Sequence, residues 1–373
     1  MKRPRYRFAG VFFAHDYVIW ALANSDPKEK IWPKVDFDFN TDLLQSSRGQ
    51  LANRFKSSGK PETDIRASVD VLAEHCDLSA LEAITIATIG PYKDGIIHSS
   101  VIAQKLSGQL ENPASIAHGT RLKAWAGFPV EDFLQECVSN QIQGEGGPKC
   151  CVLKDAEAFV LGEQYKYRHS GLPNAAETLP NTVLYLLVDQ TISSAMLVRN
   201  TLFRGGTSPE FGRMPIYRHS EDKGFKRPLS LSFPSLEDVA SLSALSSRWG
   251  VTADDIPRLN SSDLVLELIA FYLAQTLAQA AMTFAPTTMI IGGRVANNEA
   301  LASYVRHWYR DLLQIKESEE GTLFPDYYAQ RHFDQHIKLW ASPDCGVLGC
   351  VSWSQMVTDR NVITETKWSS DRI

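Results

Sequence analysis

The chain has 373 residues, of which 44% are hydrophobic and 22% charged; this composition excludes a disordered or fibrous protein and allows two globular domains. The formal net charge of -5 offers no general positive field to a phosphate backbone or to anionic lipid, so we expect neither nucleic acid nor a membrane as a partner. The basic opening MKRPRYR precedes an apolar run too short to span a bilayer, and we expect a cytoplasmic protein without a signal peptide.

The six cysteines form no CxxC pair and no cluster with histidine at the spacing of metal ligands. We therefore expect buried, reduced side chains and no metal site. Cys150 and Cys151 are adjacent on a predicted strand, where successive side chains point to opposite faces, so we do not expect them to bond to each other.

The first third of the chain alternates predicted strands and helices. Residues 7–23 contain two β-rich apolar runs broken at 14–16, which predicts a hairpin. Residues 46–64 are polar and predict a loop or a frayed helix, whereas 66–76 have the apolar spacing of a helix and 83–89 predict a buried strand.

The middle of the chain continues this alternation. Residues 130–142 predict an amphipathic helix, and a strand over 150–154 leads into a helix over 156–167. Residues 181–205 predict a second hairpin with its turn at 189–191. Two such hairpins suggest an internal duplication, although their sequences are not similar.

The last third is mostly helical. Helices are predicted over 236–250, over 261–285, from about 298 and over 343–357, and strands over 287–293 and 337–342. Alternating elements with two hairpins predict an α/β protein of mixed sheets.

The flexible segment GEGGPK marks the predicted domain boundary. We expect a smaller N-terminal α/β domain over 1–149 and a larger C-terminal α/β domain over 150–356. A C-terminal helix at about 357–373 is expected to complete the first domain.

Five segments resemble, in order and spacing, motifs of the ROK family of sugar kinases, and they are closest to its fructokinase-like branch. VLKDAEAFVLGE resembles ND-A-N-A-A-x-G-E, GGTSPEFGRMPI resembles GxxxEIGHM, and MIIGGRVAN is similar to IVIGGGV. AITIATIGPYKDG and DCGVLGCVSW resemble the family's GPxD strand and its closing AGLLGAA. The resemblance covers most of the chain and implies two ribonuclease-H-like domains of the actin/hexokinase (ASKHA) type around a central cleft.

Asp155 follows a predicted strand and opens a predicted helix, where aspartate is a favoured N-cap. The resemblance also implies that Asp155 is the general base that takes a proton from the sugar hydroxyl as it attacks the γ-phosphate. We interpret it as both. The family's preceding asparagine, a sugar ligand, is Lys154 here, which would pair with Asp155 or point into solvent. Glu163, at the end of the same motif, is a further expected substrate-binding residue.

Glu210 matches the family glutamate that binds sugar hydroxyls, since a carboxylate can accept two of them. The histidine that follows in the family is Arg213 here, which either suits an anionic substrate group or pairs with Glu210. Residues 217–235 contain no cysteine, so the family's zinc loop is missing and we expect no structural zinc.

The family holds nucleotide phosphates on two glycine-bearing hairpin turns, whose backbone N–H groups approach the phosphates closely. The first turn, DxGGT, is replaced here by Phe12 and by Ala14, His15 and Asp16. His15 and Asp16 are the expected cofactor-binding residues of this turn. Asp16, like Asp189 in the second turn, is either an ordinary hairpin-turn residue, which we favour, or part of a new metal site.

The second turn, GTGIG, appears as DQTIS, with Asp189 at its start and Thr191 as its small polar residue. A carboxylate about 4 Å from a phosphate charge costs about 4 kcal/mol at an effective dielectric constant of about 20. The third nucleotide element keeps Gly292 and Gly293 but replaces the last glycine by Arg294, which would stack on adenine or block its pocket.

Several functions remain open at this stage. One is an ATP- and Mg²⁺-dependent sugar kinase with Asp155 as base. Another is a sugar-binding protein, a sensor or assembly subunit, that no longer transfers phosphate because both glycine turns are lost. A third is other cleft chemistry on a sugar-like or anionic compound, with Asp155 and either Arg213 or His15. The resemblance also implies a homodimer, and without a helix-turn-helix before the first strand a DNA-binding repressor is not expected.

Overall fold

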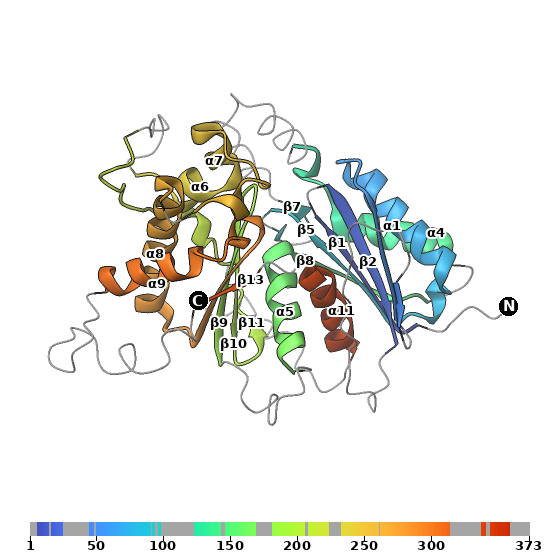
Figure 1. Ribbon diagram of the computed structural model, residues 1–373. Coiled ribbons are helices and arrows are strands. Elements are labelled where there is room, and N and C mark those ends of the chain that lie inside the picture. The colour runs from blue at the N-terminus through green and yellow to red at the C-terminus, as the bar shows by residue number, and fades with distance from the viewer. Residues whose placement is uncertain are drawn as a thin grey trace. The chain divides into compact units, whose positions relative to one another are not determined.

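The computed structural model describes residues 6–14, 16–24, 45–47, 50–90, 92–93, 96–97, 123–142, 146–168, 181–205, 208–223, 233–260, 262–313, 337–340 and 344–358 (Figure 1). These residues form two compact units. Unit 1 takes its described residues from Met1–Ile89, Phe128–Pro173 and Asp344–Ile373, and unit 2 takes its own from Gly90–Gly127 and Asn174–Pro343.

Unit 1 is built on a six-stranded mixed sheet in the order β3-β4-β2-β1-β5-β8. Its strands are β1 (Phe8–Phe13), β2 (Tyr17–Ala23), β3 (Gln45–Ser47), β4 (Gln50–Lys56), β5 (Ala83–Thr88) and β8 (Lys149–Lys154). β1 and β2 form the predicted antiparallel hairpin, whereas β5 and β8 continue the sheet in parallel. Every residue of β1 and β5 is buried, as expected for strands covered on both faces.

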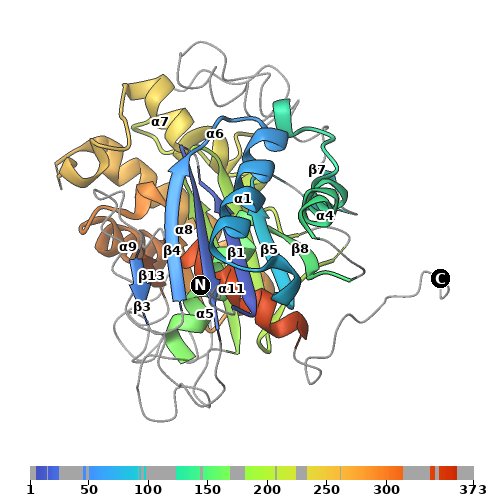
Figure 2. The same cartoon turned by 90° about the vertical axis from the view of Figure 1, so that its right-hand side faces the viewer.

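Helices cover both faces of this sheet (Figures 1 and 2). They are α1 (Pro61–His75), the short η1 (Leu78–Ala80), α4 (Val130–Gln141), α5 (Asp155–Arg168) and α11 (Asp344–Thr358). α1 and α4 pack together on one face, and α5 and α11 pack on the other. The predicted helices 66–76, 130–142, 156–167 and 343–357 are thereby confirmed.

The crossing of α5 and α11 depends on glycine. A Cβ on Gly162 of α5 would stand 2.0 Å from the carbonyl oxygen of Cys345, and a Cβ on Gly349 of α11 would stand 1.7 Å from that of Ala158. The two helix backbones therefore touch directly, which no residue with a side chain would permit. This contact fixes the helix that carries Asp155 at its first position.

Unit 2 contains a five-stranded sheet in the order β11-β10-β9-β12-β13 and a two-stranded hairpin, β6 with β7. The strands are β6 (Tyr92–Lys93), β7 (Ile96–Ile97), β9 (Thr182–Val188), β10 (Ile192–Val198), β11 (Thr201–Leu202), β12 (Thr288–Gly292) and β13 (Ile337–Trp340). β9 and β10 are the predicted second hairpin, and β12 runs parallel to β9. A hairpin followed by parallel strands occurs in both units, so the duplication suggested by the sequence is present at the level of topology.

The helices of unit 2 lie mainly on one face of its sheet (Figure 1). They are α6 (Leu236–Ala240), α7 (Leu242–Trp249), α8 (Leu264–Phe284) and α9 (Leu301–Leu312), with the 3-10 turns η2 (Phe211–Arg213), η3 (Ile256–Arg258) and η4 (Arg294–Ala296). α8 is long and apolar enough to cross a membrane, yet most of it is buried in the core of unit 2, and a core helix has the same composition.

A buried polar network fixes the segment between η2 and α6 in unit 2. Asp222 is 1% exposed and forms an ion pair with Arg248 of α7. The hydroxyl of Tyr272 in α8 donates to Asp222 Oδ2 at 2.5 Å. Burial, together with this bond to Asp222, raises the pKa of Tyr272, so the phenol stays protonated as a donor.

Two expectations differ from the structure. Within residues 46–64, the described part is mostly strand and helix: β4 pairs along its length with β2, and α1 begins at Pro61, a favoured first helical residue. The polar composition misleads because, of the β4 side chains described, only Ala52 is buried.

The boundary predicted at 149/150 also differs. β8 pairs with β5 and α5 packs on α11, so the chain up to Pro173 and the segment from Asp344 both belong to unit 1. The glycine-rich segment is a connection inside unit 1. The helix that completes this unit is α11, earlier than the predicted 357–373, which from 359 on lies outside the described residues.

All six cysteines are buried, as predicted, and none of them forms a disulfide.

Candidate functional site

Asp155 lies at the junction of β8 and α5, where strand and helix follow each other without a loop. Its side chain is buried, and Oδ1 accepts the N–H of Ala156 at 2.7 Å. That N–H is one of the four that a helix start leaves without an intrahelical partner, and the positive end of the helix favours an ionised carboxylate. Asp155 is thus the first helical residue rather than the N-cap, and it is held in one place.

Lys154 occupies the N-cap position. Its backbone N–H donates to Glu157 Oε2 at 3.0 Å, which is one half of a capping box. The Lys154 residue is 2% exposed, so the prediction that its side chain points into solvent is wrong. Glu157, which sequence reasoning missed, is a second buried carboxylate of this junction.

Glu163 lies two turns further along α5, about 12 Å from Asp155 at 1.5 Å of rise per residue. It is buried, and Cys345 Sγ of α11 donates to its Oε1 at 2.8 Å. This contact joins the two helices beside the Gly162 crossing. It favours a structural role over the substrate-binding role expected from the sequence.

Phe12 of β1 is part of the core of unit 1. Its ring meets that of Phe159 edge to face with centroids 5.1 Å apart, and a Cβ on Gly346 would stand 2.5 Å from the ring. Asp16 is exposed in the hairpin turn, and its carbonyl oxygen accepts the N–H of Ser57 at 2.9 Å. His15 lies outside the described residues.

In unit 2, Glu210 and Arg213 lie on either side of a tight contact. η2 packs against the start of β10, where a Cβ on Gly212 would stand 2.4 Å from the carbonyl oxygen of Ile192. Glu210, at the N-cap of η2, and Arg213, at its end, are both half-buried. Ser194 Oγ accepts the N–H of Phe211 at 2.9 Å, which fixes the turn to the sheet.

Asp189 and Arg294 form an ion pair, which the local sequence around either residue does not predict. Asp189 follows β9 and Arg294 follows β12, two parallel neighbours in which Leu187 and Gly292 are in register. Arg294 Nε lies 3.0 Å from both carboxylate oxygens. The charge of Asp189 is therefore balanced inside the protein, and Arg294 is committed to it rather than to an adenine ring.

The turn that contains Asp189 is held from several sides. The N–H of Asp189 donates to the carbonyl oxygen of Thr191 at 3.0 Å, and Ser243 Oγ donates to that of Gln190 at 2.7 Å. Glu237 of α6, a buried carboxylate that sequence reasoning missed, accepts the N–H of Ile192 at 2.8 Å. The turn is thus a fixed structure, as the hairpin interpretation of Asp189 requires.

Gly292 and Gly293 lie at the end of β12, and packing requires glycine at the second of them. Gly292 closes β12 between Leu187 and Trp340, and Gly293 has a φ of 88°. A Cβ on Gly293 would stand 2.4 Å from the carbonyl oxygen of Val188, so only glycine fits.

The structure thus groups the predicted residues in two sets. The first set lies in unit 1: Lys154 ends β8, Asp155 and Glu163 belong to α5, and Asp16 lies in the turn between β1 and β2. The second set lies in unit 2, after the ends of β9 and β12 and beside the start of β10. The second set contains Asp189, Thr191, Glu210, Arg213, Gly292, Gly293 and Arg294. The sequence contains one indication of the Asp189–Arg294 pair. These two residues of opposite charge stand where the family motifs have glycine, each after a predicted strand, and the two strands are parallel neighbours in the structure.

At two positions the residues present differ from those that the resemblance assigns to a magnesium nucleotide. Phe12 is a buried ring instead of a carboxylate, and Asp189 places a carboxylate in the turn after β9. Within the described residues, no three His, Cys, Asp or Glu side chains lie together as metal ligands.

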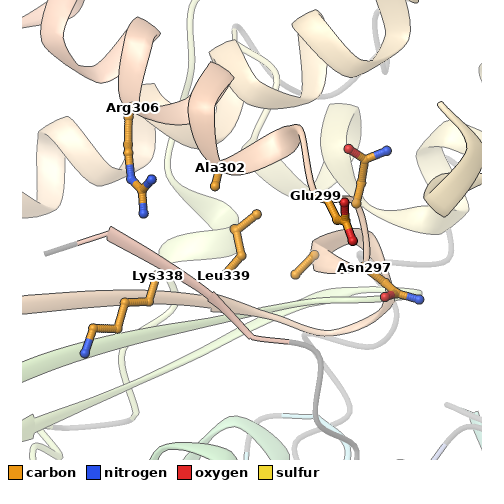
Figure 3. A pocket seen from close by; sticks show the side chains of 8 residues that line it. Asn297, Glu299, Ala302, Arg306, Lys338 and Leu339 are labelled. Atoms are coloured by element: carbon orange, nitrogen blue, oxygen red, sulfur yellow. The ribbon is translucent and has the colours of Figure 1, made fainter. Parts of the chain in front are cut away.

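Unit 2 also has an open pocket of about 420 Å³ between η4, α9 and β13 (Figure 3). Arg306 reaches from α9 toward β13, where its Nη2 donates to the carbonyl oxygen of Ile337 at 2.8 Å, and Glu299 and Asn297 lie at the other end. Among the predicted site residues that the structure describes, none lines this pocket.

Comparison with known proteins agrees with these features. A sequence model described as the ROK family matches residues 106–332. A putative fructokinase of Bacillus subtilis (strain 168) is 26% identical over 268 residues, which cover 69% of this chain and 78% of that protein.

Two solved structures show the same fold at low identity. A ROK family glucokinase from Streptomyces griseus in complex with glucose and AMPPNP has a TM-score of 0.57 and 17% identity, with 93% of this chain and 99% of that chain covered. A ROK family transcriptional regulator, a homolog of the E. coli MLC protein, has a TM-score of 0.58 and 14% identity, with 94% and 78% covered. The chain therefore belongs to the ROK family and has its sugar-kinase-like, two-domain α/β fold.

Proposed function

We propose that this protein binds a sugar and has lost phosphoryl transfer from ATP. The Asp189–Arg294 ion pair carries this proposal. In the family a glycine turn receives the phosphates of the nucleotide, whereas here the same turn carries a carboxylate that is already bonded to Arg294. An incoming phosphate would have to displace that carboxylate or lie beside its charge.

The apolar position 12 supports the proposal independently. A magnesium-organising carboxylate cannot be supplied there, because Phe12 packs against Phe159 and Gly346 in the core of unit 1. Two separate parts of the phosphate machinery are therefore changed, one in each unit.

More of the family's sugar-binding residues than of its phosphate-binding residues are present in this chain. Asp155 and Glu210 are the two carboxylates that the resemblance assigns to sugar hydroxyls, and the structure gives each of them a fixed backbone. Arg213 adds a permanent cation close to Glu210 in sequence and in η2, so a sugar with an acidic substituent is a suitable ligand. A homodimer remains a prediction, which sedimentation of the purified chain would measure.

Calorimetric titration tests this function. Neutral hexoses and sugar acids would be titrated into the protein, and ATP with magnesium would be titrated separately. We expect heat with a sugar and none with the nucleotide. Asp155→Asn and Glu210→Gln should each weaken sugar binding about tenfold or more, because each removes an acceptor for a hydroxyl. Glu221→Gln, an exposed carboxylate change in unit 2, is the matched control and should leave binding unchanged.

A sugar kinase is the second candidate, favoured by the retained Asp155 at the start of α5 and by the likeness to a putative fructokinase. It predicts that ADP forms from ATP when fructose or another hexose is present, and that Asp155→Asn abolishes this. Such turnover would overturn the proposed loss of phosphoryl transfer.

A further inference from the structure

The carboxylate of Asp189 is surrounded by hydrogen-bond donors. Arg294 Nε lies 3.0 Å from each oxygen, and Arg294 Nη2 also donates to Oδ1. The backbone N–H of Gln190 donates to Oδ1 at 2.7 Å, and that of Arg294 donates to Oδ2 at 3.3 Å. We call these donors, the Arg294 guanidinium and the two backbone N–H groups, the anion cradle.

The electrostatics show that the anion cradle is filled by a charged group. Burial by itself would raise the pKa of Asp189, but the hydrogen bonds and the charge of Arg294 outweigh it and lower the pKa below its ordinary value. Asp189 is therefore ionised throughout the neutral range. Guanidinium with backbone N–H groups is also the donor set with which proteins hold phosphate oxygens.

Contacts that do not involve the Asp189 side chain hold the backbone on both sides of the anion cradle. Gly293, in its left-handed conformation, packs against Val188 and accepts the N–H of Ala296 at 3.0 Å, which fixes the start of η4. The turn at Gln190 is fixed by Ser243 of α7. Removal of the carboxylate should therefore leave the two backbone N–H groups in place, with the Arg294 side chain attached to the same fixed backbone.

We propose that Asp189 is a built-in anion that occupies a phosphate-binding cradle, and that this cradle binds the phosphate groups of a polyphosphate once the carboxylate is removed. The proposal rests on the proposed loss of phosphoryl transfer and explains it by the competition of one side chain. With Asp189 present, its charge cancels that of Arg294. Without it, the donors that now bond to the carboxylate lose this acceptor, and Arg294 loses this counter-charge.

The test measures binding of inorganic tripolyphosphate, without magnesium, to the wild type and to Asp189→Gly by calorimetry. We expect no binding to the wild type at about 1 mM and binding at least about tenfold tighter to the variant. The double variant Asp189→Gly/Arg294→Met should lose the gain, because the guanidinium is its main source. Glu221→Gln removes one exposed negative charge from the same unit and should bring no gain, which excludes an effect of net charge alone.

Two results would overturn the proposal: tripolyphosphate binding by the wild type as tight as by the variant, or a folded Asp189→Gly protein without any gain. Unfolding curves establish that the variant is folded, and Asp189→Ser, which also removes the carboxylate, replaces it if glycine at this position prevents folding. Sugar titration of the same samples reports separately on the proposed function. If the wild type binds no sugar, the proposed function is contradicted. The tripolyphosphate result concerns the anion cradle alone.

Discussion

Gly349 of α11 approaches α5 so closely that a Cβ on it would stand 1.7 Å from the carbonyl oxygen of Ala158. Gly349→Ala should therefore force the two helices apart and destabilise the protein by about 3 kcal/mol, the upper part of the range for overpacked cores. Urea unfolding measures this loss. Gly147→Ala is the control, because that glycine is exposed and its Cβ would meet only the end of the Ile142 side chain. Equal effects of the two changes would show that the crossing does not depend on glycine.

Phe12→Asp should not restore a magnesium site. It would place a carboxylate in the apolar contact between Phe159 and Gly346, and the loss of a buried phenylalanine alone costs about 3–5 kcal/mol. We expect a lower melting temperature than for Phe12→Leu, which keeps an apolar side chain. A Phe12→Asp protein as stable as Phe12→Leu would show that the core tolerates the carboxylate.

Asp222 is the acceptor that unites Arg248 and Tyr272 in the core of unit 2. Asp222→Ala would leave a buried guanidinium without its carboxylate, and such changes cost about 3–5 kcal/mol. Tyr272→Phe removes two hydrogen bonds, the one donated to Asp222 and the one accepted from the His219 N–H at 3.3 Å, and should cost about 1–3 kcal/mol. Chemical denaturation measures the loss in free energy of unfolding for each variant, and the two losses are then compared. A smaller loss for Asp222→Ala than for Tyr272→Phe would contradict the assigned role of the ion pair.

Cys150 should make the protein less stable as the pH rises. Burial, with smaller contributions from Cys151 and Glu131, raises the pKa of its thiol to about 12. The unfolded thiol titrates near pH 8.5, so the folded state binds the proton more tightly. This stability is complete below about pH 8.5 and is lost by up to about 1.4 kcal/mol per unit as the pH rises toward the folded pKa.

Urea midpoints measured from pH 8 upward should fall more steeply for the wild type than for Cys150→Ala. In the native protein at pH 8, a thiol reagent should react slowly with Cys150 and rapidly after unfolding. Parallel pH profiles of the two proteins would rule out this contribution of Cys150.

The sequence predicts correctly the two hairpins, the helix–strand alternation and the place of Asp155 between a strand and a helix, although not its exact helical position, because each depends on local periodicity and on the end of a strand. β4 was missed, since pairing with β2 and not its own apolar pattern makes it a strand. The unit that contains α5 was also assigned incorrectly by local composition. Its place is decided by the Gly162 contact with a segment nearly two hundred residues away.

The candidate site, too, was predictable only where the local sequence decides the structure. Glycines replaced by Asp189 and Arg294 are visible in the sequence, but only the register of β9 and β12 shows that the two changes compensate each other. For Lys154 the sequence leaves open a pair with Asp155 or a side chain in solvent, whereas the direct passage from strand to helix buries the residue. Distant pairing and burial decide both cases.

The late position of α11 in the chain has a consequence for synthesis. Because this helix covers β1, β5 and α5, a nascent chain that has not yet reached Asp344 exposes the apolar face of the first sheet and the glycine surface of α5. Ribosomal elongation at about 5–20 residues per second leaves that face uncovered for about ten seconds or more after β8 has emerged. Unit 1 is thus the part of this protein that a chaperone would be expected to shield during translation, and chains that stop before Asp344 should aggregate or be degraded.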